Sequence, residues 1–127
     1  MFYKLTKFVE NLFPKNPTSE YIQVIVYCTK ADLSSGDLSK KICDVSKKSS
    51  NKAPEKNLDI WNFNNNRDKQ LLKCDDFSEM EEIFEEAEYG GVPASSICNV
   101  DNNIVLIAIG PDKTERISEL TTNLERI

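Results

Sequence analysis

One run of eight residues constrains the fold of this chain more than any other feature. The run, Tyr21 to Cys28, reads YIQVIVYC and is dominated by β-branched and aromatic residues. Because apolar residues follow one another here instead of alternating with polar ones, the run predicts a central strand buried on both faces. A polar turn with Gly36 follows, and Leu38, Ile42 and Val45 then recur at helical spacing. A buried strand that leads through a turn into a helix is typical of the start of an α/β unit.

The second half of the chain contains the clearest helical pattern, over Phe77–Tyr89. Asp75 or Asp76 can cap its first turn, where acidic residues are also favoured electrostatically. Gly90 and Gly91 end it. The glutamates between its apolar positions are expected to form a solvated face. Its predicted buried stripe consists of Phe77, Met80, Ile83, Phe84 and Ala87.

The remaining apolar runs predict further short elements joined by turns. Lys47–Lys56 is expected as a loop, because it is polar and contains Pro54. The two runs on either side of Asp101–Asn103 are close enough to form a hairpin, which Gly110-Pro111 is expected to end. The other expected elements are a short helix or turn at Leu58–Phe63, strands at Leu71–Cys74, Val92–Val100 and Ile104–Ile109, and a last helix at Thr114–Arg126. The predicted fold class is therefore α/β, a mixed four-stranded sheet with helices packed on both faces.

Residues 1–19 are predicted to form a separate N-terminal amphipathic helix and linker that precede the α/β domain of residues 20–127. Phe2, Leu5, Phe8 and Leu12 fall on one helical face, and Pro14 ends the pattern. The segment is too short and too polar to span a bilayer. It can pack on its own domain, dock on a protein partner or lie on a membrane surface.

The net charge of −5 argues at first against a nucleic-acid partner, but the charge is unevenly distributed along the chain. Residues 1–73 carry 13 Lys/Arg against 8 Asp/Glu, and residues 74–127 carry 3 against 13. Such an asymmetry permits one basic and one acidic surface, provided that the two halves do not interleave in space.

Several kinds of chemistry are excluded or disfavoured by residue content. The chain has no histidine, which excludes Ser-His-Asp and Cys-His nucleophile arrangements. Its four cysteines form no CxxC pair, so no metal site and no cofactor is predicted. No secretory signal is visible, and reduced thiols in a cytoplasmic protein are expected.

The order of these elements resembles the archaeal/eukaryotic family of peptidyl-tRNA hydrolases. The most specific string is IVLIAIGPDKTERISELTTNLERI, Ile104 to Ile127, because the family ends with a similar strand, an Ile-Gly-Pro turn and a helix whose Thr precedes a final Leu. Weaker similarities are VIVYCTKADL for the first strand, Trp61 with the short strand after it, and GGVPASSI after the long helix. The resemblance covers roughly residues 21–127 and implies hydrolysis of the ester between a peptide and a tRNA.

The sequence departs from the family where that family has its active site. The lysine-bearing Gly-Lys-Gly-Lys turn is replaced by Ser34–Asp37, so that Asp37 or Ser39 stands where the lysine should fall. The family's histidine in the next helix corresponds to Asp44 or Ser46, and its acidic loop between the last two strands is shortened to Asn99–Asn103. The remaining candidates for an acid/base group are Asp37 and Asp101.

These departures affect groups that ester hydrolysis requires. The reaction needs a base positioned to deprotonate the attacking water and groups that stabilise the oxyanion. Losing one oxyanion-stabilising group typically costs about 10²–10³-fold in rate. An aspartate at the lysine position would also repel both the oxyanion and tRNA phosphates.

Three hypotheses follow. The first is a non-catalytic relative that binds tRNA, the ribosome or a translation partner, the second is an active hydrolase that uses Asp37 or Asp101, and the third is a protein-interaction factor that uses the N-terminal or the acidic helix. In the first hypothesis the phosphate-binding residues are Lys40, Lys41, Lys47, Lys48, Lys52 and Lys56.

Overall fold

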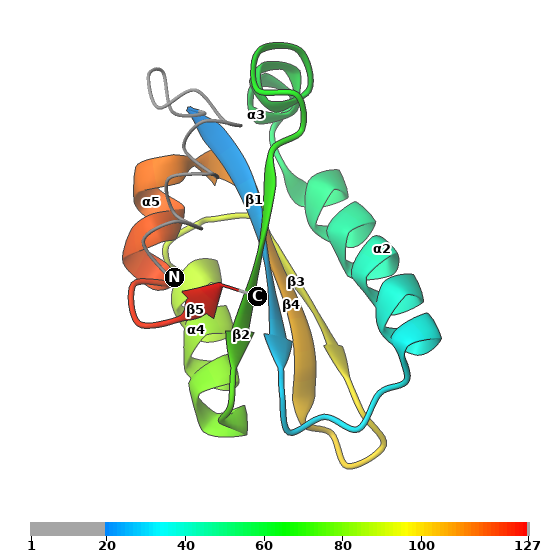
Figure 1. The fold of residues 1–127 in the computed structure, drawn as a ribbon. Coiled ribbons are helices and arrows are strands. Elements are labelled where there is room, and N and C mark those ends of the chain that lie inside the picture. Colours follow the sequence, from blue (N-terminus) through cyan, green and yellow to red (C-terminus); the bar gives the residue numbers. More distant parts are fainter. Residues whose placement is uncertain (1–19, 127) are drawn as a thin grey trace, which may run out of the picture.

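The computed structural model describes residues 20–126, which form a mixed sheet with helices on both faces (Figure 1). The strand order is β3-β4-β1-β2-β5. The strands are β1 (Tyr21–Cys28), β2 (Lys69–Cys74), β3 (Ala94–Cys98), β4 (Ile104–Lys113) and β5 (Glu125–Arg126). The helices are α2 (Ser35–Lys52), α3 (Glu55–Asp59), the π-helix η1 (Ile60–Asn64), α4 (Phe77–Tyr89) and α5 (Thr114–Leu120).

The predicted central strand is confirmed as β1. It pairs in parallel with β2 and antiparallel with β4, while β3 continues the sheet antiparallel beyond β4. All four expected strands are present, and the two-residue β5 is added antiparallel to β2.

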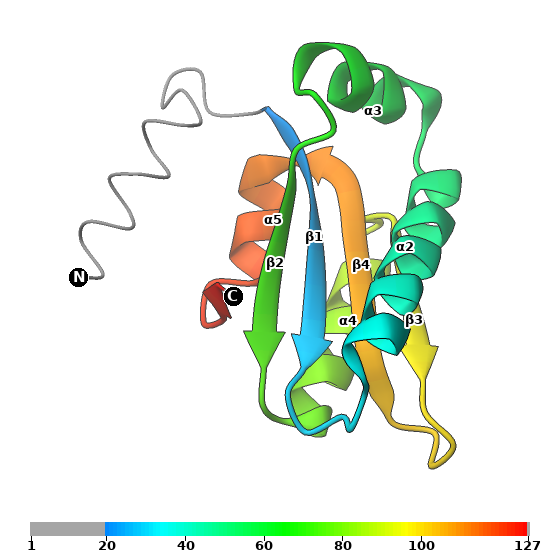
Figure 2. The ribbon, with the colours of Figure 1, turned by 45° about the vertical axis from the view of Figure 1, so that its right-hand side comes forward.

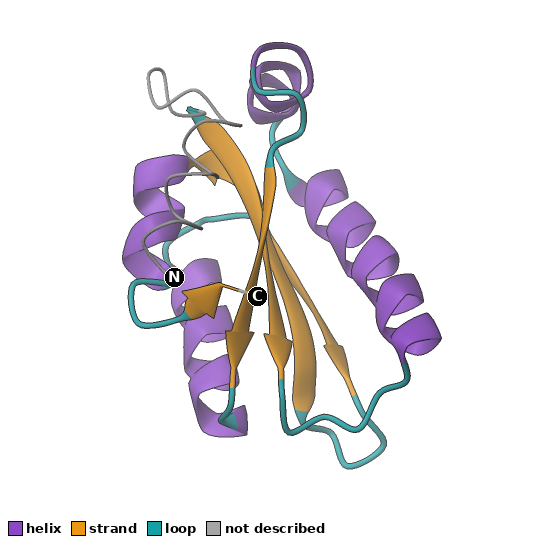
Figure 3. Ribbon diagram, viewed as in Figure 1, coloured by secondary structure: helices purple, strands orange, loops and turns teal. Residues whose placement is uncertain are grey.

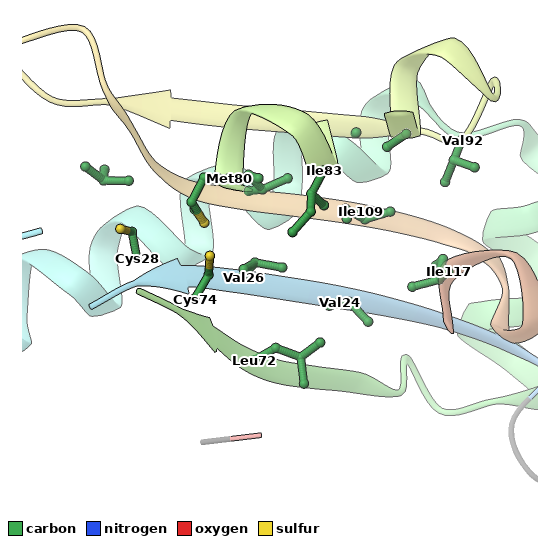
Figure 4. Close-up of a cluster of buried hydrophobic side chains, with 14 of the residues drawn as sticks. Val24, Val26, Cys28, Leu72, Cys74, Met80, Ile83, Val92, Ile109 and Ile117 are labelled. Carbon is green, nitrogen blue, oxygen red and sulfur yellow. The ribbon is translucent and has the colours of Figure 1, made fainter. Parts of the chain in front are cut away.

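Helix α2 covers one face of the sheet, and α4 and α5 cover the other (Figures 1 and 3). The alternation of β1 divides its side chains between two cores. Val24 and Val26 lie in the larger core together with Met80 and Ile83 of α4 (Figure 4). On the α2 side, Ile25 of β1 packs with Val45, Leu106 and Ala108. The prediction of helices on both faces is therefore confirmed.

Helix α2 is longer than the sequence pattern predicted. It runs to Lys52, so most of the expected loop Lys47–Lys56 is helical, and only Ala53 and Pro54 separate it from α3. The hydrophobic pattern missed these last turns because their buried positions are occupied by Ser46 and Ser49 instead of apolar residues. Polar residues can face the interior here because hydrogen bonds to neighbouring strands satisfy them.

Strand β4 continues past Gly110-Pro111, contrary to the expectation that this pair ends it. The strand extends to Lys113 through a cis Gly110–Pro111 peptide bond. Gly110 has a φ of +100°, and a Cβ atom there would lie 2.6 Å from the carbonyl oxygen of Ile22. Glycine is therefore required by both the backbone conformation and the close approach of β1.

The last helix is shorter than predicted. Helix α5 ends at Leu120, and a turn at Thr121 leads into β5. The hydroxyl of Thr121 donates to the carbonyl of Ile117, and that of Thr122 donates to the carbonyl of Ser118. Pairing of β5 with the edge of β2 then uses residues that the local pattern assigned to the helix.

The predicted N-terminal helix and linker, residues 1–19, lie outside the described residues. Among residues 20–126, no helix has the length and apolar character needed to cross a membrane.

Candidate functional site

The C-terminal ends of β1 and β2 lie at the same end of the sheet, because the two strands are parallel. Tyr27 pairs with Leu106, so the turn between β3 and β4 also lies at this end (Figures 1 and 2). The chain leaves β1 toward α2 on one face and leaves β2 toward α4 on the other. In open α/β sheets, ligands bind at such a point, beyond the carboxyl ends of the strands.

Both candidate acid/base residues lie at this end of the sheet. Asp37 is in the first turn of α2, where its backbone N–H donates to the N-cap hydroxyl of Ser34 over 3.2 Å. Asp101 is in the β3–β4 turn, which the carboxamide of Asn99 holds by accepting the backbone N–H groups of Asp101 and Asn103, both at 3.0 Å.

The side chains of these two aspartates are not held in place. Both are exposed, and within residues 20–126 neither carboxylate takes part in a hydrogen bond or an ion pair. A general base has to be positioned toward the water that it activates. The geometry brings Asp37 and Asp101 to one end of the molecule.

The same end of the sheet has a shallow depression of about 210 Å³. Burial raises the pKa of Cys74, which lies in its wall, to about 11. The thiol is therefore protonated at neutral pH, whereas the thiolate is the nucleophilic form. The other lining residues are Thr29, Lys73, Asp75, Glu79, Asn123 and Leu124.

The predicted lysines do not form a single cluster. Lys40, Lys47 and Lys48 are exposed on α2, and Lys41 is partly buried. Lys40 and Lys47, like Lys41 and Lys48, are seven residues apart, which places each pair on one side of the helix about 10.5 Å apart along its axis. We call Lys40, Lys41, Lys47 and Lys48 the α2 basic face; Asp37 and Asp44 are also exposed on this side.

The other two predicted lysines lie elsewhere. Lys52 donates from Nζ to the backbone carbonyl of Ala94 over 2.9 Å, so it already connects α2 to β3. Lys56 is exposed on α3, and this helix lies at the opposite end of the sheet from the first turn of α2 (Figure 1).

The glutamates of α4 lie on the opposite side of the sheet from the α2 basic face. The exposed glutamates of α4 are Glu81, Glu82, Glu85, Glu86 and Glu88. A groove between α4 and α5 is lined by acidic residues that include Glu82, Glu86 and Glu119. The lysine-bearing α2 and the glutamate-bearing α4 thus cover opposite faces of the sheet (Figure 3). Within residues 20–126, no three Cys, Asp or Glu side chains are grouped as a metal site would require.

The sequence pattern missed the buried polar network that fixes α2 on the sheet. The Gln23 amide, which is fully buried, donates to the carbonyl oxygens of Ser46 and Gly110 and to the hydroxyl of Ser50, each at 3.1 Å. The Ser46 hydroxyl donates back to Gln23 Oε1, and the Ser49 hydroxyl donates to the Gly110 carbonyl over 2.6 Å. The signals in the sequence were a glutamine inside an apolar strand and serines at helical spacing.

Comparison with known proteins identifies the family. The profile of the family described as peptidyl-tRNA hydrolase PTH2 matches residues 21–127. A peptidyl-tRNA hydrolase of Nanoarchaeum equitans (strain Kin4-M) is 25% identical over 112 residues, which cover 82% of this chain and 97% of that protein. The match begins at the first residue of β1 and includes every described element, so the chain belongs to the PTH2 family of peptidyl-tRNA hydrolases.

Proposed function

We propose that this protein is a non-catalytic member of its family that binds tRNA through the α2 basic face. The observation that carries the proposal is the row of four lysines on the outer side of a helix whose inner side is fixed by the Gln23 network. A rigid helix with cations at repeated spacing suits contacts to the phosphates of an RNA backbone.

The absence of catalysis is supported by the end of the sheet beyond β1. Its candidate acid/base groups, Asp37 and Asp101, are exposed, and within the described chain their carboxylates are unpartnered. Asp32, in the β1–α2 loop beside Lys30, and Asp75 and Asp76, in the β2–α4 loop, lie at the same end of the sheet, and all three aspartates are exposed. An oxyanion that forms beside these carboxylates would be destabilised, the reverse of what ester hydrolysis requires.

The first experiment measures release of a labelled peptide from peptidyl-tRNA, with an active family member as the control. We expect no release above the uncatalysed rate. Cleavage near the rate of the control would contradict the proposal and favour the active-hydrolase alternative. In that event, the double variant Asp37→Asn/Asp101→Asn decides whether these carboxylates carry the reaction, since unchanged turnover would exclude them.

The second experiment measures the affinity for deacylated tRNA at low ionic strength. The double variant Lys47→Glu/Lys48→Glu should bind about tenfold more weakly or worse, because it replaces two phosphate contacts with repulsion. Lys113→Glu is the control, since Lys113 is exposed at the end of β4, directly before α5, which covers the other face of the sheet from α2. Equal losses of affinity in both variants would mean that tRNA is attracted by charge anywhere on the protein and not by the α2 basic face. Undetectable binding of tRNA by the wild type would refute the proposed function.

A further inference from the structure

The segment between α2 and β2 exposes an aromatic ring that the fold does not use. Phe63 in η1 is 79% exposed, whereas Trp61, two residues earlier, is 4% exposed. One aromatic residue of this short helix thus anchors it to the body, and the other faces solvent. A π-helical turn of this kind is rare and occurs frequently at functional sites.

The backbone that presents Phe63 is firmly held. Trp61 Nε1 donates to the carbonyl of Asp68 over 2.9 Å, and the Asn65 carboxamide accepts the backbone N–H of Tyr21 over 3.2 Å. Asn57 Nδ2, in α3, donates to the carbonyl of Pro111 over 3.0 Å. The Trp61 bond closes the segment on itself, and the other two connect it to β1 and β4, so the exposed ring has a rigid support.

The segment that carries Phe63 contains three cationic residues but has no net positive charge. Arg67 is exposed, and its Nε donates to the side chain of Asn62, the residue next to Phe63, over 2.7 Å. The Lys69 ammonium lies 5.9 Å from the centre of the Trp61 ring, and Lys56 is exposed on α3. The same stretch also contains Glu55, Asp59 and Asp68. The positive and negative charges balance, so any attraction for RNA has to come from the ring and its immediate neighbours.

We propose that Phe63 stacks an unpaired base of an RNA whose phosphates contact the α2 basic face, with Arg67 beside the stacked nucleotide. Proteins that bind single-stranded nucleic acids combine an exposed aromatic ring with neighbouring cations in this way. The placement fits, because α3 and η1 continue directly from the C-terminal end of α2 (Figure 2). This inference rests on the proposed RNA-binding function and adds a preference for unpaired nucleotides.

The test compares a blunt RNA duplex with the same duplex carrying a single-stranded 3′ extension of about six nucleotides, using fluorescence anisotropy. The wild type should bind the extended RNA about tenfold more tightly, in line with the stacking energy of one base. Phe63→Ala should bind both RNAs with the affinity that the wild type has for the blunt duplex. Phe63→Trp should restore the higher affinity for the extended RNA. Tyr89→Ala is the matched control, because Tyr89 is 97% exposed at the end of α4, on the other face of the sheet.

The salt dependence of the affinity separates the contribution of phosphate contacts from that of base stacking. The affinity for the blunt duplex should fall steeply between 50 and 200 mM salt. The ratio of the affinities for the extended and the blunt RNA should stay constant, since stacking releases few counterions. If Phe63→Ala leaves this affinity ratio unchanged, Phe63 does not stack a base, and the proposed RNA-binding function is unaffected. A wild type that binds neither RNA would overturn both proposals and point to a protein partner for Phe63.

Discussion

At the scale of single residues, the most consequential side chain is Gln23. It is fully buried in β1 and connects α2 with the Gly110 carbonyl of β4. Gln23→Leu fills the same space but leaves the Ser46 carbonyl and hydroxyl without this partner. We expect a loss of about 2–3 kcal/mol in the free energy of unfolding, measured by urea denaturation. Gln70→Leu, at a partly exposed position of β2, should change it by less than about 0.5 kcal/mol; similar losses in both variants would show that the network has no special role.

Cys74 makes a second prediction at this scale, on the pH dependence of stability. Burial raises the pKa of its thiol from 9.0 to about 11, so the unfolded state loses this proton at lower pH than the folded state. The resulting stabilisation is complete below pH 9 and is lost as the pH rises through 11. Cys74→Ala should therefore show a shallower fall in unfolding free energy between pH 9 and 11 than the wild type. Cys43→Ala, which removes an exposed thiol, should retain the wild-type slope.

At the scale of elements, α4 offers a clean test of helix capping. The Asp76 carboxylate accepts the backbone N–H of Ser78 over 2.9 Å, and the neighbouring Asp75 is exposed and does not cap the helix. Asp76→Ala should lower the free energy of unfolding by about 1 kcal/mol, because it leaves an N-terminal N–H group of the helix without its acceptor. Asp75→Ala is the control for loss of charge alone. Equal effects in thermal unfolding would mean that electrostatics, and not the cap, stabilises this end of α4.

At the scale of the whole molecule, α2, which carries the lysines, and α4, which carries the glutamates, cover opposite faces of the sheet (Figure 3). A protein with a net charge of −5 can therefore present a basic surface to RNA. If the four lysines of the α2 basic face each contact a phosphate, the slope of log K against log salt should be about −3 to −4. Titrations between 50 and 300 mM salt measure it, and Lys47→Glu/Lys48→Glu should reduce its magnitude by about two. A flat response would rule out phosphate contacts as the basis of binding.

Local sequence patterns were sufficient to predict an element where the environment of its residues follows from their neighbours in sequence. The continuous apolar run of β1 predicted burial on both faces, and the period of Phe77 to Ala87 predicted α4. The sequence left Asp75 or Asp76 as the cap, and the structure selects Asp76. That Asp37 and Asp101 lie at one end of the sheet did not follow from the sequence, because it depends on the pairing of β1 with β4. Whether other groups hold their carboxylates likewise depends on side chains from other elements.

The sequence by itself thus determined the fold class and the presence of β1 and three further strands, since each strand was indicated by a short apolar run between turn residues. Only the tertiary structure decided the length of α2, the passage of β4 through Gly110-Pro111 and the pairing of β5 with β2. Each of these depends on hydrogen bonds between residues distant in sequence: Ser46 and Ser49 are stable inside the protein only because Gln23 and Gly110 lie opposite them. The separation of the basic and acidic faces was also decided by the tertiary structure, because it depends on the face of the sheet on which each connecting helix packs.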